Sequence, residues 1–440
     1  MQCPHPESEP DGQICQHLLA HLSQTTQLDH YRRFTGRGIE YVLLCPECAT
    51  VPGQTPGHLC WVCQDCMEDV ACGKRRGEQG RVEVRERDAG LTLQHQTLRL
   101  PTTLGRIISA VPLEGQQWLV LDDRLDLIVI DAESRSFHHF QTLKNLGISQ
   151  ESKKAAPSPF TLIASGHLVL VASTYGRYGV VADLRTGKIT MTLNRGDYRL
   201  EHCRFSAAFF GHRNRLLLAH ATDWNRLDIS DPTTGTLLTP REPTSYRHGQ
   251  KEPEHYLDYF HCGLHVSPND KWIVSNGWVW HPVGAVVVWD LQRWLENNVW
   301  ESEDGKSRRW VCQRDYYWDG PVCWTDNNTL AVWGHGRDDT LLIPGIRLFN
   351  IESGEELPGF VGPMVTNNHL RSSGIILFDE FLFSYDDGCE FAVWDIATGE
   401  QLLRDETFRP LAYQSSTKTF LSQNFDREIT LTTLRKVRES

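Results

Sequence analysis

The hydrophobic pattern of residues 90–440 is that of short strands. Runs of β-branched and aromatic residues alternate with turn residues, and no long stretch carries apolar side chains at helical spacing. One phrase recurs at intervals of about 50 residues, a period typical of repeat folds: an apolar strand ending in an acidic residue, then a turn and another strand. Its copies lie at 127–132, 180–184, 226–229, 286–291, 346–351, 391–396 and, in degenerate form, 429–434.

A second signal with the same period lies upstream of each phrase. It is a tight hairpin, found at 113–121, 164–172, 211–219, 266–275, 324–332, 377–384 and 413–422. Two independent signals therefore agree on seven units, each with about four strands, which is the content of one propeller blade. A single blade cannot bury both of its faces until neighbours stack on it. The sequence therefore predicts an all-β, seven-bladed β-propeller.

Three segments resemble the WD-repeat family. Residues 266–271, Val-Ser-Pro-Asn-Asp-Lys, look like the first hairpin of a WD repeat, and 391–399 is similar to its third strand and exit turn. Residues 426–431 have the aspartate spacing of the second hairpin. The resemblance runs from about Gly90 to Val437 and implies a WD-repeat-like propeller. Two units keep the Trp-Asp pair (Trp289-Asp290 and Trp394-Asp395), and no unit clearly places the usual Gly-His pair, so the repeats are divergent.

Closure of the ring follows from the strand content. The last unit ends at Val437, too early for a fourth strand of its own, whereas residues 91–98 form a β-rich segment before the first unit. We expect this segment to pair with the last blade, which would remove an open sheet edge. The expected organisation is thus a propeller over 90–440, closed by strand 91–98, and a separate module over 1–80.

Cysteine usage singles out the first 80 residues. Eight of the 13 cysteines lie there, closely spaced, in a chain whose polar N-terminus is no secretory signal. Such cysteines are typical of metal ligands rather than disulfides. An apolar strand, 41–44, runs into Cys45 and Cys48, and Cys60 and Cys63 follow eleven residues later. Two such knuckles can place four thiolates around one tetrahedral zinc, which predicts a closed, structural site.

The module is similar to a treble-clef zinc finger, with a helical turn expected at 65–71. The remaining ligand types allow a second zinc, built from Cys3, Cys15 or His17, Cys66 and Cys72. The alternative is that Cys66 and Cys72 are buried thiols. An iron–sulfur cluster on Cys60, Cys63, Cys66 and Cys72 fits less well, because the last interval is longer than in ferredoxins and no proline follows Cys72.

The turns between second and third strands gather on one face of a propeller. Here they carry residue types that dominate interaction hot spots, namely Tyr175, Arg177, Tyr178, Trp224, Trp278 and Trp280. We expect these six to form the partner-binding site, although the tryptophans could instead pack beneath long loops. The aromatic-rich segment 294–324 reads as a long connection between blades four and five, suited to a docking flap or a lid.

The net charge and the absence of several known motifs limit the classes of function that the sequence favours. The net charge of −12 argues against nucleic acid and anionic membranes as partners, and no stretch has the length of a membrane helix. The sequence contains no nucleophile elbow, phosphate-binding loop, dinucleotide-binding fingerprint or metalloprotease helix. We therefore expect a cytoplasmic, monomeric, non-catalytic scaffold that binds protein partners. The alternative is an enzyme or small-ligand binder whose site in the axial mouth uses His281, His335, Arg177 and Asp338, because the fold alone does not decide.

Overall fold

The computed structural model is almost entirely β-structure, with 7% helix and 53% strand. It describes residues 3, 12–21, 31–34, 41–45, 47–48, 59–63, 66–67, 70, 81–82, 84–98, 104–149, 159–246, 249–280, 282–335, 343–363, 367–368, 371–372, 375–385, 390–424 and 428–436. Within these ranges, no helix has the length and hydropathy needed to cross a bilayer.

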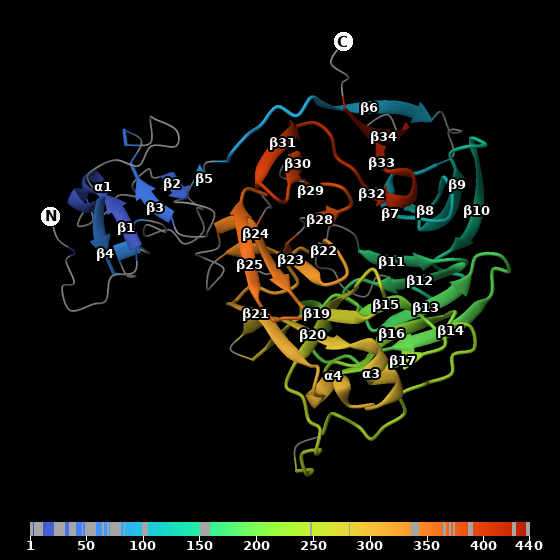
Figure 1. The fold of residues 1–440 in the computed structure, drawn as a ribbon. Helices are drawn as coiled ribbons and strands as arrows, with labels where there is room; N and C mark the ends of the chain where they lie inside the picture. The colour runs from blue at the N-terminus through green and yellow to red at the C-terminus, as the bar shows by residue number, and fades with distance from the viewer. Residues whose placement is uncertain are drawn as a thin grey trace.

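Seven antiparallel sheets follow one another around a ring in the described part of the chain (Figure 1). The first blade contains β7 (Ile107–Pro112), β8 (Gln117–Asp122), β9 (Asp126–Asp131) and β10 (Ser136–Thr142). The second contains β11 (Phe160–Ser165), β12 (Leu168–Ser173), β13 (Tyr178–Asp183) and β14 (Ile189–Asn194). The third contains β15 (Ala207–His212), β16 (Arg215–Asp223) and β17 (Arg226–Ser230). The third blade has three named strands, and a bridge from Ser230 to Leu237 occupies the place of a fourth.

The remaining blades complete the ring. Blade four contains β18 (Phe260–Val266), β19 (Trp272–Val279), β20 (Val283–Asp290) and β21 (Arg309–Asp315), and blade five contains β22 (Val322–Trp324), β23 (Thr329–His335), β24 (Ile343–Asn350) and β25 (Glu356–Val361). Blade six contains β28 (Ile375–Phe378), β29 (Leu382–Tyr385), β30 (Phe391–Asp395) and β31 (Glu400–Asp405). Blade seven contains β32 (Ala412–Gln414), β33 (Thr419–Gln423), β34 (Ile429–Lys436) and β6 (Leu91–Leu98). A small ribbon, β26 (Asn367–Asn368) with β27 (Arg371–Ser372), and two 3-10 turns, Leu200–His202 and Ser415–Thr417, lie between blade strands. The seven-bladed fold expected from the sequence is confirmed.

The recurring phrase of the sequence is explained by its exit turn. The Asp231 side chain accepts hydrogen bonds from the N–H groups of Thr233 (2.9 Å) and Thr234 (3.3 Å), and the Gly235 N–H donates to the Asp231 carbonyl (2.8 Å). Gly235 has φ +72°, a conformation that costs glycine little. The same arrangement recurs at Asn350 with Gly354 and at Asp395 with Gly399. Local turn chemistry therefore produces the repeat pattern.

The ring is closed by a strand from the N-terminal side. β6 pairs antiparallel with β34 along its whole length, from Leu98 opposite Ile429 to Leu91 opposite Lys436. In Figure 1 it forms the outer edge of the last blade. Behind it, Leu98 and Ile429 pack in one buried cluster with Trp118 of the first blade. Burying each such side chain contributes about 1.5–3 kcal/mol, so the seam is part of the core.

The segment 294–324 differs from the expected flap. It begins within helix α3 (Leu291–Glu296), continues through α4 (Glu301–Asp304), and then supplies β21, the fourth strand of blade four. Its rings at 294, 317, 318 and 324 are buried, whereas those of Trp310 and Tyr316 are exposed. A buried ionic contact, Arg241 to Glu303 at 2.6 Å, fastens α4 to the loop after blade three. Four of its aromatic rings therefore belong to the core of the propeller, and the segment supplies a blade strand rather than a separate flap or lid.

The N-terminal module is built on a five-stranded mixed sheet with the order β4-β1-β3-β2-β5. Its elements are β1 (Gly12–Cys15), α1 (Gln16–His21), β2 (Tyr31–Phe34), β3 (Tyr41–Leu44), β4 (Leu59–Val62) and β5 (Arg81–Val82). Cys66, Met67 and Val70 are helical, in agreement with the turn expected at 65–71.

The chain between module and ring lies along blade six. The Arg87 N–H donates to the Gln401 carbonyl (2.9 Å), and the Gln401 N–H donates to the Arg85 carbonyl (2.8 Å). The Arg87 guanidinium also reaches Asp395 at 2.8 Å and Glu400 at 2.6 Å. This segment thus adds a short edge to β31 before the chain enters β6.

Candidate metal centres and exposed aromatic side chains

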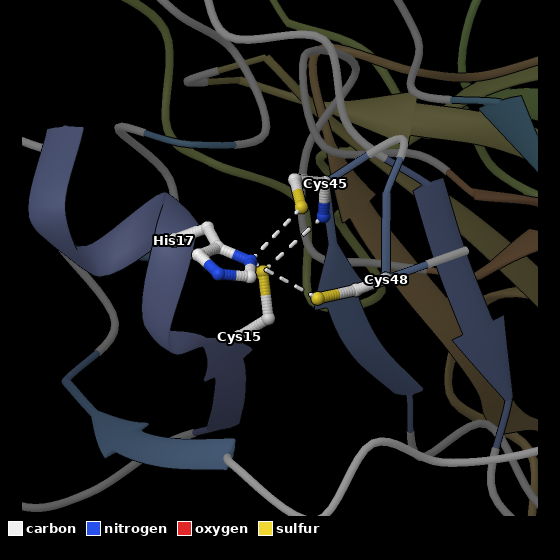
Figure 2. Close-up of side chains that lie close together, drawn as sticks. All are labelled: Cys15, His17, Cys45 and Cys48. Atoms are coloured by element: carbon white, nitrogen blue, oxygen red, sulfur yellow. Dashed lines mark hydrogen bonds between the residues drawn. The ribbon is translucent and has the colours of Figure 1, made fainter. Parts of the chain in front are cut away.

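Four metal-ligand side chains of the module converge on one point (Figure 2). The donor atoms of Cys15, His17, Cys45 and Cys48 all lie within 4.8 Å of one another. The strand pairing explains this meeting. β1 runs parallel to β3, with Ile14 opposite Leu43, so the two strands end side by side. Cys15 and Cys45 follow at those ends, and α1 begins immediately after Cys15 and carries His17.

The spacing of these donors fits a tetrahedral ion. The His17 Nδ1 lies 3.2 Å from the Cys48 Sγ and 3.5 Å from the Cys45 Sγ. A tetrahedral zinc with its usual bond lengths separates a sulfur from a nitrogen ligand by about 3.5 Å. Three sulfurs and one imidazole nitrogen also form a recognised zinc ligand set. The residues present therefore fit a divalent metal such as zinc.

The acid–base state of the thiols points the same way. Burial, together with hydrogen bonding to Cys45, raises the pKa of Cys48 to about 12, and burial also raises the pKa of Cys15. At Cys45 burial is outweighed by hydrogen bonds from the Cys48 amide and His17, so the pKa of that thiol is lowered. The lowered pKa favours the thiolate at Cys45, and the raised pKa values oppose ionisation of the other two thiols. A cation removes that resistance, because metal binding deprotonates its thiol ligands.

A second group of cysteines lies in the same module. The Sγ atoms of Cys3, Cys63 and Cys66 lie within 4.8 Å of one another, with 3.7 Å between those of Cys3 and Cys66. Two sulfurs on one tetrahedral zinc are about 3.8 Å apart. Burial, with hydrogen bonds from the neighbouring thiols, raises the pKa of Cys66. Within the described ranges, no fourth donor joins this group.

The cysteines are grouped differently from the sequence expectation, which placed both knuckles on one ion. β4 runs antiparallel to β1, with Cys15 opposite Leu59 and Gly12 opposite Val62. Cys63 therefore emerges at the end of the sheet opposite to Cys45 and Cys48. Each knuckle thus contributes to its own group.

The remaining expected ligands divide as follows. Cys60 pairs opposite Ile14, within the edge strand β4, and belongs to neither group. Cys15 and His17 join the first knuckle, and Cys3 and Cys66 join the second. Cys72 lies outside the described residues. Spacing alone could not assign these ligands, because it does not reveal that β1 is parallel to one knuckle strand and antiparallel to the other.

Two of the six residues expected at the partner site are core residues. Tyr175 is 5% exposed and Trp278 only 3%. The Trp278 ring lies flat on Phe260, with centroids 3.9 Å apart, and its Nε1 donates to the Cys203 Sγ (3.3 Å). Neither ring can contact a partner.

The other four remain accessible in different degrees. Tyr178 and Trp280 are exposed, whereas Arg177 and Trp224 are half-buried. The Arg177 Nε donates to the Asn194 Oδ1 at 2.9 Å, and its guanidinium lies over the Tyr178 ring. The Trp224 and Trp280 rings both contact Phe260, at 4.4 and 5.5 Å between centroids.

Sequence reasoning missed three tyrosines that surround Trp224. The rings of Tyr198 and Tyr256 lie 5.5 and 6.4 Å from it, and Tyr246 lies 5.1 Å from Tyr256. Two of these come from the long loop after blade three, where the run Tyr256-Leu257-Asp258-Tyr259-Phe260 was the available signal. We call Tyr198, Trp224, Tyr246 and Tyr256 the aromatic patch.

The alternative catalytic set is not assembled by the described residues. His335 is buried, its Nε2 lies 3.3 Å from the Phe360 carbonyl, and burial lowers its pKa to about 4. It therefore faces the blade interior rather than the axial mouth. His281 and Asp338 lie outside the described residues.

Comparisons with known proteins bear on the fold. No family model matches the chain, and no curated protein matches it in sequence. Among solved structures, 1001 chains match, including one from a crystal structure of a mitotic checkpoint complex. That match has 13% identity and a TM-score of 0.47, and covers 81% of this chain and 96% of the other. A likeness at this level carries no functional conclusion.

Fold and sites together define a class. The chain is a seven-bladed β-propeller with a cysteine-rich N-terminal module. Two groups of cysteine and histidine side chains in that module could each bind a metal ion.

Proposed function

We propose that this chain is a non-catalytic protein-interaction scaffold, a divergent WD-repeat propeller whose N-terminal module, residues 1–80, folds around structural zinc. The observation that carries the proposal is the set of large aromatic side chains left exposed on blades two to four and their connections: Tyr178, Tyr198, Tyr246, Trp280, Trp310 and Tyr316. Exposed aromatic side chains that lie close together commonly mark a partner-binding surface. Of this set, Tyr198 and Trp280 both lie within 6 Å of Phe260 between ring centroids. A rigid ring holds these side chains without a folding cost on binding.

Capture of a partner tests the scaffold role. The intact protein should retain a specific partner from its source cells, and the purified partner should rebind it. The double variant Tyr198→Ala/Trp280→Ala should lose this binding with an unchanged melting temperature, because both side chains are exposed. Retention of the same partner by the double variant would exclude this surface. Substrate turnover by the purified chain would favour the enzyme alternative.

The zinc proposal is tested by metal content. We expect two zinc ions per chain by elemental analysis, one lost in Cys48→Ser and the other in Cys66→Ser. Cys60→Ser is the matched control and should keep both, because Cys60 belongs to neither group. Iron with labile sulfide would refute zinc. Loss of one shared ion in both Cys48→Ser and Cys60→Ser would instead restore the single four-cysteine site.

A further inference from the structure

The aromatic patch is held in place from beneath. Phe260, which is buried, lies 4.4 Å from Trp224 and 5.9 Å from Tyr198 between ring centroids. Tyr198 is 48% exposed and Tyr246 is 40% exposed, while the other two rings of the patch are half-buried. The patch therefore exposes aromatic rings to solvent while the buried Phe260 ring packs beneath them. This packing fixes their positions, which a flexible loop alone would not do.

Carboxylates lie among these rings. The Tyr246 hydroxyl donates to Glu252 at 3.0 Å. Burial, and then the negative charge of Asp258, raise the pKa of Tyr256 to about 12. Burial alone raises the pKa of Asp258.

A narrow hollow beside the patch adds a further acceptor. Its lining includes Tyr198, Asp223, Trp224 and two buried side chains, Arg195 and His261. The Arg195 guanidinium donates to three backbone carbonyls. The His261 Nδ1 lies 3.0 Å from the Ser275 hydroxyl, whereas its Nε2 has no hydrogen-bond partner. Burial, and then the positive charges of Arg308 and Arg241, keep the pKa of His261 well below its usual value, so the ring is neutral. An unpaired, fully buried ring nitrogen at this place can bond to a water or to a donor from a ligand.

We propose that the aromatic patch binds a lysine or arginine side chain of a partner protein. Aromatic faces attract cations within about 6 Å of their centroids, and the effect is largest where water is excluded. Asp258 and Glu252 supply the opposite charge, and the whole chain carries −12, which favours a basic partner. The inference rests on the proposed scaffold function and names the chemistry that the partner must present.

An apolar or acidic partner segment fits this surface less well. An apolar side chain would cover the Asp258 and Glu252 carboxylates without replacing the water that they lose. An acidic segment would meet them as like charges. Only a cationic side chain uses both the rings and the carboxylates.

Peptides that differ at one position test the proposal. Nine-residue peptides with a central Lys, Arg, norleucine or Glu between identical glycine and serine flanks are titrated into the intact chain. The readout is the indole N–H resonance of Trp224, assigned with Trp224→Phe. The Lys or Arg peptide should bind at least tenfold more tightly than the norleucine peptide, and the Glu peptide should cause no shift. High salt should weaken the cationic peptides because it screens the carboxylates.

Matched variants complete the test. Tyr198→Ala and Asp258→Asn should each weaken the cationic peptide by about threefold to tenfold, whereas Trp310→Ala, another exposed aromatic side chain, should leave it unchanged. Equal affinity for norleucine, or no effect of both patch variants, would overturn the cation inference. If the partner protein is still captured in that case, the scaffold function stands. If the partner is lost in neither Tyr198→Ala nor Asp258→Asn, the patch is not its site.

Discussion

The indole of Trp278 shows how one contact decides the role of a residue. It is stacked on Phe260 and donates to Cys203. The substitution Trp278→Ala therefore leaves a cavity and removes the ring that packs against Phe260, beneath the aromatic patch. We expect the substitution to lower the free energy of unfolding by about 3–5 kcal/mol. Trp310→Ala, at a side chain that is 45% exposed, should change it by less than about 0.5 kcal/mol. Urea denaturation of the two variants measures both, and equal small effects would place Trp278 at the surface.

Two histidines with lowered pKa values contribute to the pH dependence of stability. Burial lowers the pKa of His265 and of His335 to about 4, against about 6.5 in an unfolded chain. Between these values the unfolded state binds protons that the folded state does not. The stability is therefore complete above pH 6.5 and falls as the pH drops towards 4, by up to about 1.4 kcal/mol per pH unit for each histidine. Unfolding in urea at pH 7.5, 6 and 5 measures this slope, and His335→Gln should make it shallower. An unchanged slope in that variant would show that His335 titrates normally.

Sequence patterns predicted which residue types matter but not which of them are exposed. Trp278 lies within β19 and Trp280 lies just beyond its end. Phe260, which pairs opposite Trp278 from the neighbouring strand, is stacked on the Trp278 ring and covers it. Phe260 meets Trp280 only edge-on, and Trp280 stays exposed. Burial of this kind depends on the pairing of strands. It cannot be predicted from two tryptophans that lie two positions apart in the sequence.

At the scale of elements, local chemistry was readable and long-range pairing was not. The hairpins and exit turns carry their own signals, such as the Asp231 and Gly235 turn, so all seven blades were predicted correctly. The metal-ligand groups depend on β1 lying between β3 and β4, parallel to β3 and antiparallel to β4. No spacing in the sequence specifies that order.

The closing strand gives a prediction about truncation. Deleting residues 1–80 should leave a soluble propeller, because β6 and its eight paired residues remain. Deleting residues 1–100 should cause aggregation or unfolding, since β34 then becomes an open edge and Leu98 is lost from the buried seam. Thermal melting and gel filtration of the two truncations measure the difference. Equal behaviour would mean that β6 contributes little to the ring.

At the scale of the whole molecule, we expect the two parts of the chain to lose structure separately. A strong zinc chelator should unfold the N-terminal module, whose core is small, and spare the propeller, whose clusters contain no metal-ligand group among the described residues. Proteolysis should then cleave within residues 1–80 while a resistant fragment starting near Val84 survives. Calorimetry should show the propeller transition at an unchanged temperature. A shift of that transition would mean that the module stabilises the ring.

The origin of the closing strand also affects how the chain is made by the ribosome. His95 of β6 and Thr432 of β34 bond to each other at 2.9 Å across 337 residues of sequence. At synthesis rates of about 5–20 residues per second, β6 leaves the ribosome roughly 15–70 seconds before its partner exists. Throughout that interval the nascent chain holds an unpaired strand and an incomplete ring. Premature release or a stalled ribosome would therefore leave β6 unpaired and the edge of the incomplete ring open, and such partially translated chains are the species most in need of a chaperone.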